Sequence, residues 1–170
     1  MRQYLITVTG PDRTGIVSDI SNIITNGGGN IEESRMAQLS GDFAIIMLIT
    51  TNTSRIDLEV QLGVLQPLLI NVKNTTTKEV KNRVQTRQLL LTGADNEGIV
   101  NTVTSYLTEK GINIESMDTE TVQAPISGTT LFKMQAIIQI PNTLEIHDLV
   151  TKLTLLGESL SVELELISVI

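Results

Sequence analysis

The sequence contains one short motif twice, at a constant spacing. The first occurrence is Gly10-Pro11-Asp12-Arg13-Thr14-Gly15-Ile16-Val17, and the second is Gly93-Ala94-Asp95-Asn96-Glu97-Gly98-Ile99-Val100. Farther along, Asn30-Ile31-Glu32 corresponds to Asn113-Ile114-Glu115. Both matches have an offset of 83 residues, from 93 − 10 and from 113 − 30. A constant offset indicates two copies of one unit, and we expect a small domain at residues 1–84 and another at 85–170.

The hydrophobic pattern predicts the same order of elements in each unit. Strands are expected at residues 3–9, 31–39, 43–50 and 72–84, and again at 87–92, 112–123, 131–140 and 160–169. The first helix of each unit carries an apolar stripe at helical spacing: Ile16, Val17, Ile20, Ile23 and Ile24, then Ile99, Val100, Val103, Tyr106 and Leu107. The second helices carry Leu58, Leu62, Leu65 and Leu69, with Pro67 expected to kink or end the helix, and Ile146, Leu149, Val150, Leu153 and Leu156.

The predicted order is therefore βαββαβ, twice. It is typical of the ferredoxin-like unit, an α+β fold with a four-stranded antiparallel sheet and two helices on one face. Only about four residues near 83–86 link the two units, which favours packing of the domains side by side.

Composition excludes several classes of function. Hydrophobic residues make up 41% of the chain and aromatic residues 2%, so the cores should be aliphatic. The net charge is −7 with 12 Lys and Arg, which argues against direct nucleic-acid binding. No cysteine is present, which excludes disulfides and thiolate chemistry and fits a cytoplasmic protein. We also expect no signal peptide and no membrane span.

The repeated residues have the chemistry to bind a free amino acid. The turn after the first strand and the start of the second strand are expected to meet in the fold. Gly15 and Gly98 allow close approach at a helix start, where free N–H groups attract an anion such as a carboxylate. Asp12 suits an ammonium group, and the Asn30 amide offers both a donor and an acceptor.

Structural explanations compete with this interpretation. Asp12, Thr14 and Asp95 are also plausible helix N-caps, and Asn30 tolerates a left-handed backbone. Arg13 suits a solvated surface charge, and His147 suits an exposed helix position. No grouping for nucleophilic catalysis and no metal-ligand spacing is found, so neither an enzyme nor a cofactor or metal is expected.

The motif Gly-x-Asp-Arg-x-Gly-Ile-Val, followed by Gly-Asn-Ile, resembles the ACT domain. Two tandem copies without a catalytic domain are most similar to the glycine cleavage system transcriptional repressor family. The resemblance implies a non-catalytic regulatory protein that senses an amino acid, glycine or serine foremost, and acts through a transcription regulator or a metabolic enzyme. The ligand-binding positions that it implies are Asp12, Arg13, Thr14, Gly15, Ile16, Asn30 and Ile31, and Asp95, Asn96, Gly98, Ile99, Asn113 and Ile114.

Two further expectations follow. Asn96 and Glu97 stand where the first copy has Arg13 and Thr14, so the stronger site is expected in the first copy. The uncovered sheet face and the apolar residues 166–170 predict a homodimer. The alternative function is a structural regulatory subunit that docks on an enzyme of amino-acid metabolism by sheet extension and binds no ligand itself.

Overall fold

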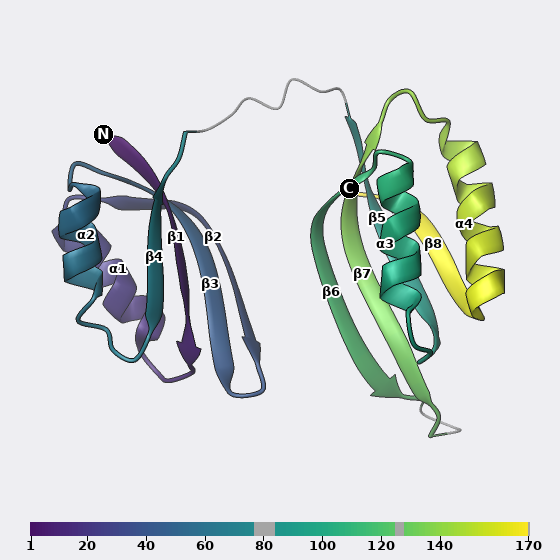
Figure 1. Cartoon of the computed structure of the whole chain (residues 1–170), viewed down its shortest axis with the longest axis horizontal. Helices are drawn as coiled ribbons and strands as arrows, with labels where there is room; N and C mark the ends of the chain where they lie inside the picture. The colour runs from purple at the N-terminus through teal and green to yellow at the C-terminus, as the bar shows by residue number, and fades with distance from the viewer. Residues whose placement is uncertain (77–83, 125–127, 170) are drawn as a thin grey trace. The chain divides into compact units, whose positions relative to one another are not determined.

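The computed structural model describes residues 1–76, 84–124 and 128–169. The chain divides into two compact units, Met1–Glu79 and Val80–Ile170 (Figure 1). The first unit consists of β1 (Arg2–Pro11), α1 (Ile16–Asn26), β2 (Asn30–Leu39), β3 (Asp42–Thr51), α2 (Arg55–Leu62) and β4 (Leu69–Asn74). The second consists of β5 (Val84–Ala94), α3 (Ile99–Glu109), β6 (Asn113–Gln123), β7 (Thr130–Pro141), α4 (Ile146–Leu160) and β8 (Val162–Ser168).

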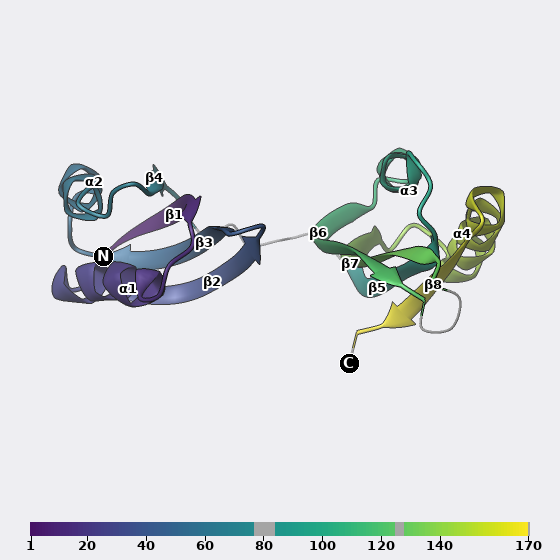
Figure 2. The same cartoon turned by 90° about the horizontal axis from the view of Figure 1, so that it is seen from below.

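Both units have the predicted α+β fold. The strand order is β2-β3-β1-β4 in the first sheet and β6-β7-β5-β8 in the second, and all neighbouring strands are antiparallel. Figure 2 shows the two helices of each unit on one side of its sheet. The other side of each sheet is uncovered within its unit, and we call it the open face. The βαββαβ prediction is confirmed for both copies.

An aliphatic core lies between each sheet and its helices. In the first unit, alternate residues of β1 (Tyr4, Ile6 and Val8) are buried against one stripe of α1. That stripe is Ile16, Ile20 and Ile24, with one residue in every four facing the sheet. In the second unit the stripe is Ile99, Val103 and Leu107, over Leu89 and Leu91. The predicted stripes are confirmed at these positions, while Val17 stays 42% exposed.

The second helix of the first unit is shorter than its leucine spacing suggests. α2 ends at Leu62, and Gly63 is its C-cap. Leu65 therefore lies in the following loop, and Leu69 begins β4. The leucine spacing therefore continues beyond the end of the helix. Pro67 could not extend α2, because it has no N–H to donate to a helical hydrogen bond.

The closing strand of the first unit also differs from the prediction. β4 begins at Leu69 rather than residue 72 and ends at Asn74. Val84, the predicted end of that strand, instead begins β5, where it pairs with Pro141. Residues 77–83 of the predicted strand, and with them part of the predicted linker, lie outside the described residues. A run of alternating residues does not by itself reveal where one strand ends and the next begins.

No helix within the described residues is long and apolar enough to cross a membrane.

The motif glycine of the second unit permits a close strand approach. A Cβ atom on Gly93 would lie 2.6 Å from Val162 Cγ1 and 2.7 Å from Val162 Cα, and Val162 is its partner on β8. The backbone of β8 would have to move to admit a side chain. We therefore expect Gly93→Ala to lower the free energy of unfolding by about 1–3 kcal/mol, as overpacking does in well-packed cores.

Urea denaturation followed by circular dichroism measures this loss. Thr92→Ala is the control, because Thr92 is the exposed neighbour of Gly93 on the same strand. Equal stabilities of the two variants would contradict the steric explanation.

Candidate functional site

The repeated motif forms the turn between the first strand and the first helix of each unit. Gly15 is the N-cap of α1 with φ 94°, and its carbonyl accepts the first helical hydrogen bond from the Asp19 N–H at 2.8 Å. Gly98 is the N-cap of α3 with φ 84°, and the Thr102 N–H donates to its carbonyl at 2.9 Å. The left-handed backbone at both positions favours glycine over any residue with a Cβ.

The side chains of the turn do not cap the helices. Neither Gly15 nor Gly98 is accompanied by a side-chain cap hydrogen bond, so the N-cap interpretation of Asp12, Thr14 and Asp95 is wrong. The reason is conformational: the chain reaches helical geometry only after the left-handed glycine. N–H groups of the first helical turn are consequently available to an anion.

Arg13 is held by an ion pair. Its Nη2 donates to Asp19 Oδ2 at 2.8 Å, and its Nη1 donates to the Thr14 carbonyl at 3.3 Å. The two charged side chains are 46% and 40% exposed, so the pair is accessible to solvent. Arg13 is therefore not simply a solvated charge. It is placed beside the start of α1, on the same turn as Asp12.

Asp12 and Asp95 occupy the same motif position, at which both copies have an exposed carboxylate. Both are exposed, and neither side chain makes a hydrogen bond or ion pair within the described part of the chain. The backbone of Asp12 is fixed, because its N–H donates to the Gly41 carbonyl at 2.8 Å. Gly41 lies at the two-residue tip of the β2–β3 hairpin. The Asp12 carboxylate thus projects from an anchored backbone and has no partner among the residues that the structure describes.

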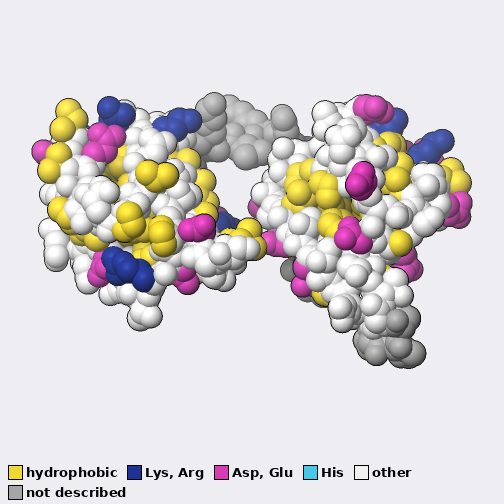
Figure 3. Space-filling view, turned by 60° about the horizontal axis from the view of Figure 1, so that its bottom comes forward, with side chains coloured by type: hydrophobic (Ala, Val, Ile, Leu, Met, Phe, Trp, Pro, Cys, Tyr) yellow, Lys and Arg dark blue, Asp and Glu magenta, His cyan; other side chains and the backbone are white. Residues whose placement is uncertain are grey.

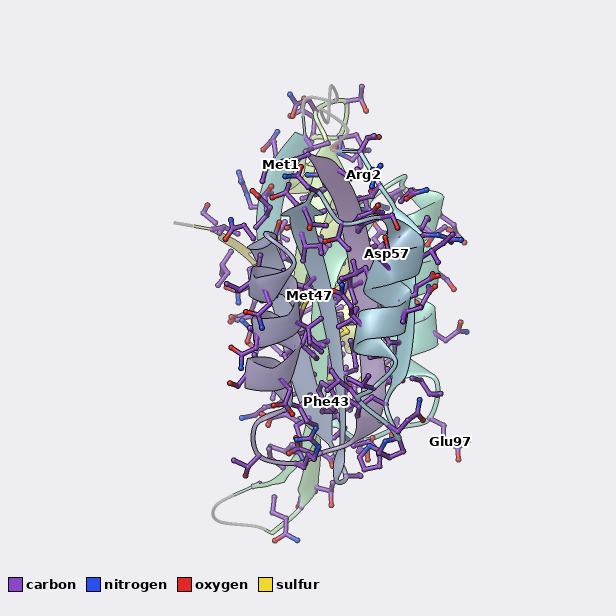
Figure 4. The ribbon with its side chains drawn as sticks, turned by 90° about the vertical axis from the view of Figure 1, so that its left-hand side faces the viewer. Met1, Arg2, Phe43, Met47, Asp57 and Glu97 are labelled. Carbon is purple, nitrogen blue, oxygen red and sulfur yellow. The ribbon has the colours of Figure 1, made fainter. Side chains whose placement is uncertain are left out.

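Asn30 lies at the opposite end of the sheet from this turn. Asn30 pairs with Thr50, whereas Pro11, at the end of β1, pairs with Asp42. Eight residues of β3 separate the two levels, which corresponds to about 27 Å of extended strand. Figure 4 shows this separation, with Arg2 near one end of the first unit and Phe43 near the other. The second unit has the same separation. Asn113 pairs with Gln139 of β7, whereas Ala94, at the end of β5, pairs with Leu131 of the same strand.

The expectation that the two halves of the motif meet in one unit is therefore wrong. α1 runs back along the sheet before β2 begins, so β2 starts level with the beginning of β1 and not with its end. A single amino acid is far too small to contact both Asp12 and Asn30 of one unit.

The Asn-Ile-Glu half of the motif has a structural explanation in the sheet. A β-bulge follows Ile31 in the first unit and Ile114 in the second, and the extra residue is Glu32 or Glu115. Thr50 Oγ1 donates to Glu32 Oε1 at 2.8 Å, and Gln139 Nε2 donates to Glu115 Oε2 at 3.0 Å.

The asparagine of this motif is the first residue of a strand in both units. Asn30 does not have a left-handed backbone, because the described non-glycine residues with positive φ are Ser40 and Ser161. Asn113 Nδ2 donates to Gln139 Oε1 at 3.3 Å, which adds it to the bulge network. Ile31 and Ile114 are partly buried against their cores. The repeated glutamate was the sequence signal for this arrangement.

An open hollow of about 500 Å³ borders the second turn. Four of the residues that line it were predicted from the motif: Asp95, Asn96, Gly98 and Ile99. Sequence reasoning missed Asn101, Thr104 and Phe132. Val100 was recognised in the motif and in the helix stripe, but it was not predicted as a ligand-binding position. Phe132 is paired with Gly93, and Phe43 is paired with Gly10 in the same way, so the chain's two phenylalanines occupy equivalent positions.

The described residues contain no group of three or more His, Cys, Asp or Glu side chains placed to hold a metal ion. His147 is exposed on α4, as predicted.

The fold and the repeated turn define a protein built from two ferredoxin-like units in tandem. Residues 2–73 match the family model of the ACT domain, so the first unit belongs to this family, and the second unit repeats its topology and its motif.

Several known proteins are similar to this chain in sequence or in structure. Over 82 residues the chain is 42% identical to the glycine cleavage system transcriptional repressor of Escherichia coli (strain K12), which covers 45% of this chain and 43% of the relative. The match thus spans less than half of that relative's length. The crystal structure of an unknown protein from Galdieria sulphuraria has a TM-score of 0.87 and 34% identity over 99% of both chains. A candidate glycine cleavage system transcriptional repressor has a TM-score of 0.67 at 22% identity, over 97% of this chain and 95% of its own, which shows a shared fold.

The absence of a capping role for Asp12 can be tested directly. Asp12→Ala is expected to change the free energy of unfolding by less than about 0.5 kcal/mol, as surface substitutions do. Ser54→Ala is the comparison, because Ser54 Oγ caps α2 by accepting from the Asp57 N–H at 3.2 Å. Loss of that cap should cost about 1 kcal/mol. Urea denaturation of both variants provides the measurement, and an equal loss in Asp12→Ala would restore the capping interpretation.

Proposed function

We propose that the chain is a non-catalytic regulatory protein that senses a free amino acid. The observation that carries the proposal is the pair of aspartates, Asp12 and Asp95. Both copies retain an exposed carboxylate that has no partner in the described part of the chain, beside a helix start without a side-chain cap. The homology to a glycine cleavage system transcriptional repressor supports a regulatory role, with glycine or serine as the first ligands to test.

The turn offers complementary groups to the two charges of an amino acid. The Asp12 carboxylate binds the ammonium group, and the N–H groups at the start of α1 bind the carboxylate. Arg13 adds positive charge on the same turn, although it shares that charge with Asp19. Gly15 and the buried Ile16 shape the backbone that presents these groups. Because Asn30 lies at the far end of its own unit, it reaches such a ligand only from another molecule of the protein.

The two turns differ in charge, and we propose that the first binds more tightly. Asn96 and Glu97 replace Arg13 and Thr14, so the second turn loses a cation and gains a carboxylate. The hollow beside the second turn provides room for a ligand, with Asn101 and Thr104 as neutral polar groups. Weaker binding at the second turn is therefore the expected consequence of charge and not of space.

We further propose that the sensor acts in the cytoplasm through a protein partner, a transcription regulator or a metabolic enzyme. Its two domains are the two compact units, with the boundary placed before Val84 and not after it, because Val84 begins β5 of the second unit. The rival function remains a structural subunit that docks by sheet extension. It is favoured by β2, an edge strand of ten residues that is exposed along nearly its whole length.

Calorimetric titration of the full chain with a panel of free amino acids tests the proposal. We expect binding of glycine or serine, with Asp12→Ala weakening the tighter site at least tenfold because the ammonium group loses its partner. Asp95→Ala should affect only the weaker site. Asp148→Ala is the matched control, since Asp148 is an exposed carboxylate on α4, outside both turns.

Absence of heat for every amino acid at millimolar concentration would contradict sensing and favour the docking subunit. Binding that survives in the double variant Asp12→Ala/Asp95→Ala would refute the assignment of the site.

A further inference from the structure

Asp19 is the counter-ion of Arg13 and lies in the first turn of α1. The Arg13 Nη2 atom donates to Asp19 Oδ2 at 2.8 Å, and Nη1 donates to the Thr14 carbonyl at 3.3 Å. Arginine binds a carboxylate best through two parallel hydrogen bonds from its planar fork, and Asp19 already occupies one side of that fork. A ligand carboxylate therefore has to share the cation with Asp19 or displace it.

The second copy lacks both members of this ion pair. At the offset of 83 residues, Asn96 replaces Arg13 and Thr102 replaces Asp19. The Thr102 hydroxyl donates to the Gly98 carbonyl at 3.0 Å, so this position carries no negative charge at the start of α3. The cation and its counter-ion have thus changed together between the copies, as expected if the two side chains act as a unit in the first turn.

Positive charge is scarce in this chain, which makes the counter-ion of Arg13 important for an anionic ligand. The chain has 12 Lys and Arg against 19 Asp and Glu. On the side shown in Figure 3, the Lys and Arg side chains of the first unit are few and are interspersed with Asp and Glu. Asp12, Arg13 and Asp19 together give the first turn a net negative charge. Such a turn repels a lone anion more than it repels an amino acid, whose ammonium group offsets its carboxylate.

We propose that Asp19 is a specificity-determining residue of the first turn, because it occupies the position of the ligand carboxylate at Arg13 and has to be displaced from it. The proposal rests on the amino-acid site proposed at this turn. A lone anion gains only the contact that Asp19 gives up. An amino acid also gains the contact between its ammonium group and Asp12. Asp19 thereby excludes simple anions, and it lowers the affinity for the amino acid itself.

The displacement of Asp19 costs little. The side chains of Arg13 and Asp19 are 46% and 40% exposed. An exposed ion pair of this kind changes an equilibrium constant by at most a factor of about five, because water screens both charges. Asp19 therefore adjusts the affinity of the first turn and does not block it.

Titration of Asp19→Asn with glycine and serine, and with the amides of both, tests the proposal. Backbone amide signals of residues 12–18 in NMR report binding at the first turn. Asp19→Asn keeps the size of the side chain and removes its charge, so we expect it to bind glycine or serine about threefold to tenfold more tightly than the unaltered chain. The two amides have an ammonium group but no carboxylate, so their binding should stay the same or weaken. A general change of the fold would affect the acids and the amides in the same direction.

Two further variants are the controls. Asp148→Asn removes a matched charge, because Asp148 is an exposed carboxylate in the first turn of α4, and it should leave binding unchanged. Asp19→Glu keeps the charge and should bind within about twofold of the unaltered chain. Circular dichroism checks that each variant is folded.

The outcomes distinguish the role of Asp19 from the site on which it depends. If glycine or serine binds at the first turn, but no more tightly to Asp19→Asn than to the unaltered chain, the role of Asp19 is overturned and the site stands. Equal gains for the acids and their amides would also overturn that role. No binding to either the unaltered chain or Asp19→Asn would refute the site for glycine or serine and, with it, the role of Asp19.

Discussion

The left-handed glycine before each first helix is the constraint on which the arrangement of both units depends. Gly15 and Gly98 turn the chain from the end of a strand into a helix within four residues, at φ 94° and 84°. The turn directs Ile16 and Ile99 into the cores, where the helical stripe continues from them. The same conformation leaves each helix start without a side-chain cap and holds the preceding aspartate at the surface. The motif glycine therefore determines both the packing of the first helix on the core and the exposure of the groups proposed to bind a ligand.

Much of the repeated motif is explained by folding alone. Gly93 permits the approach of β8, Gly98 permits the turn, and Ile99 is part of the core. Asn113 and Glu115 belong to a hydrogen-bonded bulge. The aspartate at the turn has no such duty in either copy within the described residues. A residue that two diverged copies share, without a structural partner, is the strongest candidate for contact with a ligand.

The sequence predicted the fold well, because helical stripes and strand alternation are local and both copies repeat them. It failed at α2, where Leu65 and Leu69 continue the helical spacing beyond Gly63, on either side of Pro67. It also failed for the candidate site. Spacing shows that Asp12 and Asn30 recur together, but the direction of α1 decides that they lie at opposite ends of a sheet. Asn101, Thr104 and Phe132 were missed because only the fold brings them to the second turn. The two copies have also diverged on their open faces, where Leu69 and Ala37 of the first unit correspond to Glu163 and Glu120 of the second.

We propose that the two turns bind a free amino acid unequally. The most direct measurement is a titration of the isotope-labelled chain with glycine and with serine, followed by the backbone amide signals in NMR. We expect shifts at residues 12–18 at low ligand concentration and at residues 95–101 only at higher concentration. Shifts at neither turn, or equal shifts at both turns throughout the titration, would contradict it.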